Sequence, residues 1–163
     1  PHPLPAPEEK HRYVREMFDA IAPRYDLLNS LLSLRLHHRW RAAAVRAAEL
    51  GPGDRALDVC TGTGDLAFAL ARAVGERGAV AATDFSAPML HLGEEKARRR
   101  TPRPPVRFSL ADTQALPFAD GAFDAVTVAF GIRNVADIRR GIAEMARVAR
   151  PGGRVVLLEF NQP

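Results

Sequence analysis

The chain has 163 residues, enough for one domain with a single core. Hydrophobic residues make up 47% of it and charged residues 26%, which excludes a largely disordered or fibrous protein. The net charge of +4 comes almost entirely from arginine, because Lys10 and Lys96 are the only lysines. Such an excess of positive charge could bind nucleic acid or an anionic membrane surface, or it could simply lie on solvated helix faces.

No segment has the features of a membrane span or a secretory signal. The longest apolar runs fall far short of the roughly 20 residues that a spanning helix needs. The N-terminal PHPLPAPEEK has no basic stretch followed by an apolar one. Cys60 is the only cysteine, which excludes an intramolecular disulfide and a cysteine-rich metal site. We expect a cytoplasmic protein without a bound metal, in which Cys60 packs as a small hydrophobic residue.

Three sections follow one another along the chain. Residues 1–7 hold four prolines and predict a flexible tail. Residues 8–50 have apolar side chains at helical spacing, interrupted at Pro23, and predict an all-helical N-terminal section that covers the site. The GPGD turn at Gly51 ends this section, and residues 51–163 are predicted to form the ligand-binding domain.

Short apolar segments alternate with helical ones in this last section. The expected strands are Arg55–Cys60, Ala79–Asp84, Val106–Leu110, Phe123–Phe130 and Arg154–Phe160. The expected helices are Asp65–Gly75, Pro88–Arg100 and Ile138–Ala149. This alternation predicts an α/β fold, a doubly wound, Rossmann-like parallel sheet with helices on both faces. Because an uncovered edge strand invites aggregation, we also expect further C-terminal strands in the native protein.

A glycine-rich turn joins the first expected strand to the first expected helix, in the segment LDVCTGTGD from Leu57. Gly62 and Gly64 let a ligand approach the backbone at a helix N-terminus, a pattern shared with dinucleotide-binding domains. Asp58 and Asp65 flank this turn, and their carboxylates would repel a pyrophosphate but attract the sulfonium and ammonium groups of S-adenosylmethionine. Asp65 has a second interpretation, as a carboxylate that stabilises the helix start.

Further acids follow the next two strands. Asp84 comes 20 residues after Gly64 and ends the second strand, where an acid can bind both hydroxyls of an adenosine ribose. The alternative is that Asp84 caps the helix that begins near Pro88. Asp112 and Thr113 follow the third strand, where they suit the exocyclic amine of adenine or form an ordinary turn. Together these residues predict a site for S-adenosylmethionine.

The ordered motifs resemble those of class I methyltransferases, and two segments narrow the resemblance to the ubiquinone/menaquinone biosynthesis C-methyltransferases. One segment is YDLLNSLLS from Tyr25, which continues to Trp40. The other is FGIRN from Phe130, followed by the stretch 147–160. Where family members often have serine, this chain has Ala129, which removes a hydrogen bond worth about 1 kcal/mol net.

The resemblance implies cofactor contacts from Thr63, Asp84, Asp112 and Thr113, and a quinol as the methyl acceptor. Methylation of a ring carbon requires loss of a hydroxyl proton, alignment of both substrates, exclusion of water and stabilisation of the quinolate oxygen. We expect the residues that meet these requirements to lie at the carboxyl ends of the strands, where doubly wound sheets bind ligands.

Arg133 and Asn134 follow the fourth strand and are the candidate catalytic residues. The pKa of arginine is too high for a base, so Arg133 would hold the quinolate oxygen or a water, unless it is a surface residue. His37 could accept a proton, but a histidine on a helix is more often a packing or surface residue. Tyr25 could cover the cofactor or pack between helices.

The resemblance therefore predicts a C-methyltransferase that acts on a prenylated quinol, demethylmenaquinol first among the candidates. The leucines from Leu27 to Leu36 could line a channel for the isoprenoid tail, and the basic residues from Arg35 to Arg41 could dock at the inner face of the membrane. A methyltransferase for a benzoquinol or another small molecule is the main alternative. The sequence has no recognised nucleic-acid motif, which argues against a nucleic-acid methyltransferase. An inactive scaffold protein would need a broken cofactor loop. Whether the protein forms a homodimer is left open.

Overall fold

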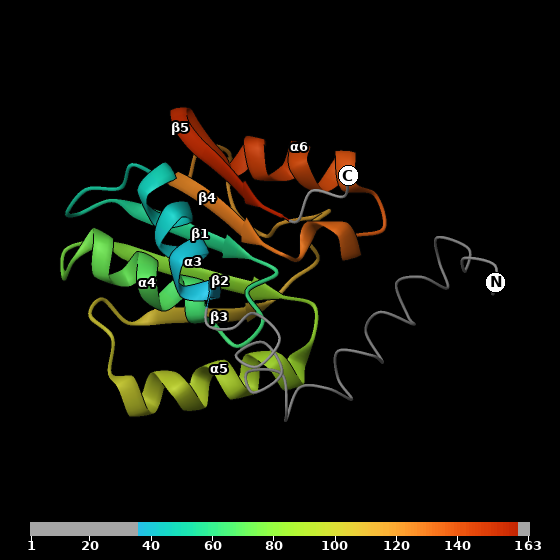
Figure 1. The fold of residues 1–163 in the computed structure, drawn as a ribbon. Helices are drawn as coiled ribbons and strands as arrows, with labels where there is room; N and C mark the ends of the chain where they lie inside the picture. The colour runs from blue at the N-terminus through green and yellow to red at the C-terminus, as the bar shows by residue number, and fades with distance from the viewer. Residues whose placement is uncertain (1–35, 160–163) are drawn as a thin grey trace.

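The computed structural model describes residues 36–159. Within them a five-stranded parallel sheet has the order β3-β2-β1-β4-β5 and carries helices on both faces (Figure 1). The strands are β1 (Arg55–Val59), β2 (Ala79–Asp84), β3 (Val106–Leu110), β4 (Phe123–Ala129) and β5 (Ala149–Leu158). The helices are α3 (Leu36–Ala47), α4 (Asp65–Val74), α5 (Ala87–Arg100), α6 (Ile138–Val148) and the 3-10 turn η2 (Ile132–Asn134). The predicted doubly wound α/β class is confirmed.

Some predictions fall on residues outside the described range. The flexible tail over residues 1–7, the helices before residue 36 and the position of Tyr25 belong to this group. Between Leu36 and Glu159, no helix is long and apolar enough to cross a bilayer.

The central strands β1, β2 and β4 are largely buried on both faces, which explains their nearly continuous apolar sequences. In β1, Ala56 points to the side covered by α3 and α4, while Leu57 and Val59 point to the side covered by α6. All three side chains are fully buried. Helix α4 buries one apolar stripe on the sheet, and its Phe68 meets the ring of Phe108 edge to face, with centroids 6.0 Å apart.

Helix starts next to the site are fixed by short polar side chains. The Ser86 hydroxyl accepts a hydrogen bond from the Met89 N–H at the start of α5. The cap near Pro88 is therefore Ser86 and not Asp84, so the alternative role considered for Asp84 is wrong. Helix α6 begins in the same way, with Asp137 accepting from the Arg140 N–H at 3.0 Å.

Two strand ends differ from the prediction for a backbone reason. Strands β1 and β4 stop one residue early because Cys60 and Phe130 take positive φ angles of 51° and 57°. Such angles are uncommon for residues other than glycine and cluster at functional sites. Both residues lie at the same edge of the sheet.

The start of the fifth strand was also predicted wrongly. Strand β5 begins at Ala149, which pairs with Phe123, whereas the sequence predicted a start at Arg154, which pairs with Ala125. The Pro-Gly-Gly segment between them, with Gly152 at φ 76°, is an irregularity within the strand rather than a turn before it.

Candidate functional site

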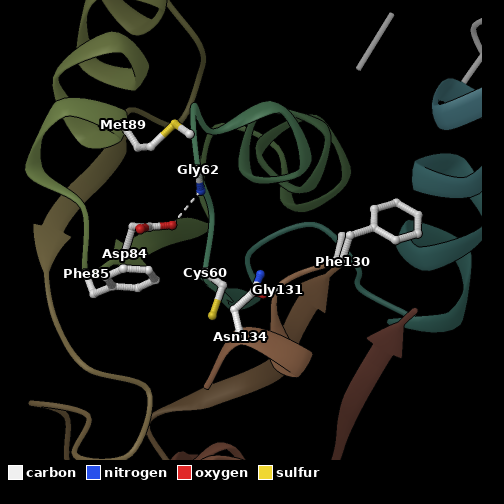
Figure 2. A pocket seen from close by; sticks show the side chains of 9 residues that line it. Cys60, Gly62, Asp84, Phe85, Met89, Phe130, Gly131 and Asn134 are labelled. Atoms are coloured by element: carbon white, nitrogen blue, oxygen red, sulfur yellow. Dashed lines mark hydrogen bonds between the residues drawn. The ribbon is translucent and has the colours of Figure 1, made fainter. Parts of the chain in front are cut away.

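A hollow opens at the carboxyl ends of β1, β2 and β4 (Figure 2). It lies where the chain order reverses between β1 and β4, the place where doubly wound sheets bind ligands. The lining residues are Cys60, Gly62, Asp84, Phe85, Met89, Ala129, Phe130, Gly131 and Asn134. Asp84 is the only one of them with a charged side chain, and the walls are otherwise mostly apolar.

The turn between β1 and α4 requires its glycines. Gly62 and Gly64 have φ angles of 57° and 85°, in the left-handed region that favours glycine. A Cβ atom on Gly64 would also lie 2.8 Å from the ring of Phe108. The turn is fixed by bonds from the Thr61 N–H to the Thr83 carbonyl at 2.9 Å and from the Gly64 N–H to the Thr61 carbonyl at 3.0 Å.

Asp84 connects this turn to the start of α5. Its Oδ2 accepts a hydrogen bond from the Gly62 N–H at 2.8 Å, and its Oδ1 accepts one from the Ser86 N–H at 2.9 Å. The side chain is buried, yet it forms part of the wall of the hollow beside Phe85 (Figure 2). A carboxylate that can accept from ribose hydroxyls, next to apolar side chains that can contact a base, fits an adenosine ligand.

Asp58 lies beneath the turn rather than in the hollow. Its two carboxyl oxygens accept hydrogen bonds from the hydroxyls of Thr61 at 2.6 Å and Thr127 at 2.7 Å. Burial raises the pKa of Asp58 to about 7, although the two hydroxyls lower it, and Asp84 adds a smaller rise. Burial therefore favours the neutral form of the Asp58 side chain, which weakens the predicted role of its charge.

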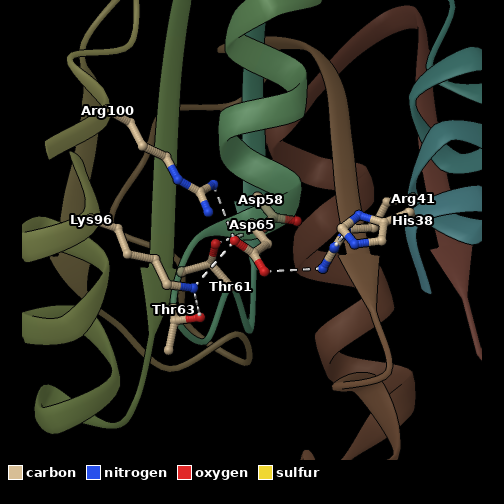
Figure 3. A network of polar contacts seen from close by, with 8 residues as sticks. All are labelled: His38, Arg41, Asp58, Thr61, Thr63, Asp65, Lys96 and Arg100. Carbon is tan, nitrogen blue, oxygen red and sulfur yellow. Dashed lines mark hydrogen bonds and ion pairs between the residues drawn. The ribbon is translucent and has the colours of Figure 1, made fainter. Parts of the chain in front are cut away.

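Asp65 sits at the centre of a group of cations (Figure 3). Its Oδ2 pairs with Arg41 of α3 at 3.1 Å, and its Oδ1 pairs with Lys96 at 3.2 Å and Arg100 at 3.3 Å, both from α5. Burial alone would raise the pKa of Asp65, but the three cations outweigh it and lower that pKa. The three ion pairs largely neutralise the Asp65 carboxylate, and its place at the start of α4 favours the second interpretation, while a contact with a ligand stays a prediction.

The remaining predicted cofactor residues lie around the hollow without forming its described wall. Thr63 is buried and accepts a hydrogen bond from Lys96 at 2.7 Å. Asp112 accepts from the backbone and side-chain amides of Gln114, which is the geometry of an ordinary turn. Thr113 is buried, with its hydroxyl 3.4 Å from the Cys60 sulfur. Their contacts with a cofactor stay predictions.

The segment after β4 brings the predicted catalytic residues to the same edge. Asn134 lines the hollow, and Arg133 next to it forms an ion pair with Glu159 at 3.1 Å. Phe130 points away from Asp84 toward α3 (Figure 2), where its ring meets Trp40 edge to face at 5.7 Å. Helix α3 therefore packs beside the hollow. His37 belongs to α3, but its side chain lies outside the described part of the chain.

Sequence reasoning missed three lining residues. Cys60 packs against the core as expected, but it also forms part of the wall of the hollow, next to Gly131, where an added Cβ would come 2.4 Å from the Cys60 Cβ. Burial raises the pKa of the Cys60 thiol to about 12, so it stays protonated. Phe85 and Met89 also escaped notice. The sequence did offer a signal for two of these residues. Cys60 is the last residue of one predicted strand, and Phe85 directly follows the end of another.

Comparison with known proteins gives a family match over most of the chain. The model of the ubiE/COQ5 methyltransferase family matches residues 6–163. The chain is 47% identical over 155 residues to the "Ubiquinone/menaquinone biosynthesis C-methyltransferase UbiE" of Geobacter sulfurreducens, covering 95% of this chain and 60% of that protein. It is 45% identical over 150 residues to the "2-phytyl-1,4-naphtoquinone methyltransferase" of Synechocystis sp., covering 92% and 63%.

A third relative is the "Demethylmenaquinone methyltransferase" of Shouchella clausii, 44% identical over 158 residues, which cover 96% of this chain and 66% of that protein. The chain thus spans 60 to 66% of the length of these relatives. Among solved structures it is similar to the YcgJ protein of Bacillus subtilis, with a TM-score of 0.72, 28% identity and coverage of 78% and 53%. The [4+2]-cyclase SpnF has a TM-score of 0.76, 28% identity and coverage of 88% and 58%.

Proposed function

Because this chain belongs to the ubiE/COQ5 methyltransferase family, we propose that it catalyses transfer of a methyl group from S-adenosylmethionine to a ring carbon of a prenylated quinol, converting demethylmenaquinol to menaquinol. The observation that carries this proposal is the 44 to 45% identity to relatives named for demethylmenaquinone and for a 1,4-naphtoquinone. The hollow at the switch point of the sheet supports it, since the residues there fit an adenosine.

When bound, S-adenosylmethionine supplies an electrophilic methyl group on a sulfonium sulfur. Asp84 accepts hydrogen bonds from the ribose hydroxyls, and the glycine turn lets the ligand lie close to the backbone at Gly62 and Gly64. Phe85 and Met89, in the apolar wall of the hollow, would contact the base. Thr63, Asp112, Thr113 and Tyr25 are further proposed contacts.

On the acceptor side, this chain holds the quinol and stabilises its charge. Asn134 in the wall of the hollow can bind a ring hydroxyl through its amide. Arg133 stabilises the oxygen that becomes negative when the ring hydroxyl loses its proton. The proton leaves to water or to His37, because a guanidinium stays protonated. The contact between Trp40 and Phe130 closes the side of the hollow toward α3 and helps to exclude water.

A benzoquinol acceptor is the second candidate, since the Geobacter sulfurreducens relative is named for both ubiquinone and menaquinone biosynthesis. We further propose that the enzyme works at the inner face of the membrane, where a prenylated quinol resides, and that nucleic acid is not a partner. The basic residues around α3, including His38 and Arg39, suit an anionic surface. A homodimer stays a prediction.

A competition assay tests the proposed acceptor. The purified enzyme is given labelled S-adenosylmethionine and a mixture of reduced short-chain demethylmenaquinol and the corresponding benzoquinol, and the two methylated products are quantified separately. We expect a higher kcat/KM for the naphthoquinol. A higher value for the benzoquinol would favour the second candidate, and binding of S-adenosylmethionine without methylation of either ring would point to another small molecule.

A further inference from the structure

The ends of β4 and β5 bring two charged side chains together beside the hollow. Ala129 and Leu158 are paired in the sheet, and the Phe130 N–H donates to the Leu158 carbonyl at 2.8 Å. Both strands therefore end at the same level. Glu159 follows β5 directly, and its Oε1 lies 3.1 Å from the Nη1 of Arg133.

Local contacts fix the backbone around Arg133, but the Arg133 side chain keeps a single orientation only if another group holds it. Ile132 is buried, and the Asn134 N–H donates to the Gly131 carbonyl at 3.0 Å. The Arg133 side chain itself is 52% exposed. An exposed arginine loses rotamer entropy when it is ordered, so without a group that holds it the side chain would sample many positions.

The Arg133–Glu159 pair differs from ordinary surface pairs in its burial. The Glu159 side chain is only 23% exposed, and the pair is within hydrogen-bond distance. By comparison, Arg103 and Glu76 are 3.7 Å apart with exposed fractions of 77% and 74%. Water screens the second pair far more strongly, and such surface pairs contribute little. The Glu159 carboxylate can therefore restrain its arginine, whereas Glu76 cannot.

We propose that Glu159 is a positioning residue for methyl transfer, which holds the guanidinium of Arg133 in the direction that meets the quinolate oxygen. The planar guanidinium has five N–H donors and can donate to a carboxylate and to a substrate oxygen at once. Glu159 is unchanged through the reaction, because the ring proton leaves to another acceptor. The part that Arg133 plays in catalysis rests on the proposed function, while the contact between the two side chains does not.

Single-turnover methyl transfer at saturating S-adenosylmethionine tests this role. Glu159→Gln should lower the rate about 10- to 100-fold, the scale of a small misplacement of a catalytic group. Glu159→Asp should recover part of the loss, and the affinity for S-adenosylmethionine should change less than about twofold. Glu76→Gln, which removes the exposed control pair, should leave the rate unchanged. A normal rate in Glu159→Gln, with a slow Arg133→Ala enzyme, would overturn the proposal.

The double variant separates positioning from any independent role. If Glu159 acts only through Arg133, then Arg133→Ala with Glu159→Gln should be no slower than Arg133→Ala alone. A double variant whose rate is lowered by the product of the two single-variant factors would contradict the proposal, because Glu159 would then act independently of Arg133.

A second readout does not depend on activity. The 15N relaxation of the Arg133 Nε–H group should show an ordered side chain in the wild type and a mobile one in Glu159→Gln. Unchanged mobility would refute positioning. If the wild type methylates neither quinol, the proposed function fails, and this measurement still decides whether Glu159 holds Arg133.

Discussion

Replacement of Asp58 by asparagine should remove a strong dependence of the free energy of unfolding on pH. The Asp58 side chain is 1% exposed, and burial raises its pKa from 3.8 to about 7. Below pH 3.8 the carboxyl group is protonated in the folded and the unfolded protein alike. As the pH rises above that value, the unfolded chain releases the proton while the folded protein keeps it until about pH 7, so unfolding becomes easier.

The size of the effect follows from the change in pKa. Each unit corresponds to about 1.4 kcal/mol, so a rise of roughly three units lowers the free energy of unfolding by about 4 kcal/mol between about pH 4 and pH 8. In the Asp58→Asn variant the side chain stays neutral throughout, and the Thr61 and Thr127 hydroxyls can still bond to an amide. The variant should therefore be more stable than the wild type at about pH 8, by up to about 4 kcal/mol.

Urea unfolding at several pH values from about 2 to about 8 provides the measurement. Asp124→Asn is a matched control of opposite sign, because hydrogen bonds from the Arg55 backbone and from Arg150 lower the pKa of Asp124. That variant should be less stable than the wild type at neutral pH, and the difference should vanish as the pH falls through the lowered pKa. Parallel pH curves for Asp58→Asn and the wild type would refute the account of Asp58.

Two further predictions concern the site itself. Asp84→Ala should weaken binding of S-adenosylmethionine by roughly 1 to 3 kcal/mol, because the ribose hydroxyls lose a charged acceptor. Calorimetry measures this affinity, and an unchanged value in the folded variant would contradict the assignment. Arg133→Ala should lower turnover about 10²- to 10³-fold with little change in that affinity, and Arg133→Lys should restore only part of it. A folded Arg133→Ala enzyme with a near-normal single-turnover rate would make Arg133 a surface residue.

The local pattern of apolar and polar residues was sufficient to predict most of the fold. The bounds of β2 and β3 match the prediction, because alternating apolar segments between turns are a local property of the chain. The ends of β1 and β4 were missed since Cys60 and Phe130 adopt positive φ angles that no apolar pattern encodes. At Cys60 the neighbouring Gly131 comes from a distant part of the sequence, so this close approach is visible only in the folded chain.

The charges around the site show where sequence reasoning failed. The partners of Asp65 lie 24 to 35 residues away, on α3 and α5, and the turn sequence alone gives no sign of them. The ion pair of Arg133 with Glu159 likewise depends on β4 and β5 being neighbours. Asp84 was placed correctly at the end of its strand because both the strand and its spacing from the glycine turn are local features.

The central claim is that this chain methylates a ring carbon of demethylmenaquinol. It is tested most directly by giving the purified enzyme reduced demethylmenaquinol and S-adenosylmethionine with a deuterated methyl group, followed by mass spectrometry and NMR of the product. The account predicts one deuterated methyl group on the ring carbon, with menaquinol as the product. A methyl group on a ring oxygen, or no transfer to the quinol by an enzyme that binds S-adenosylmethionine, would contradict it.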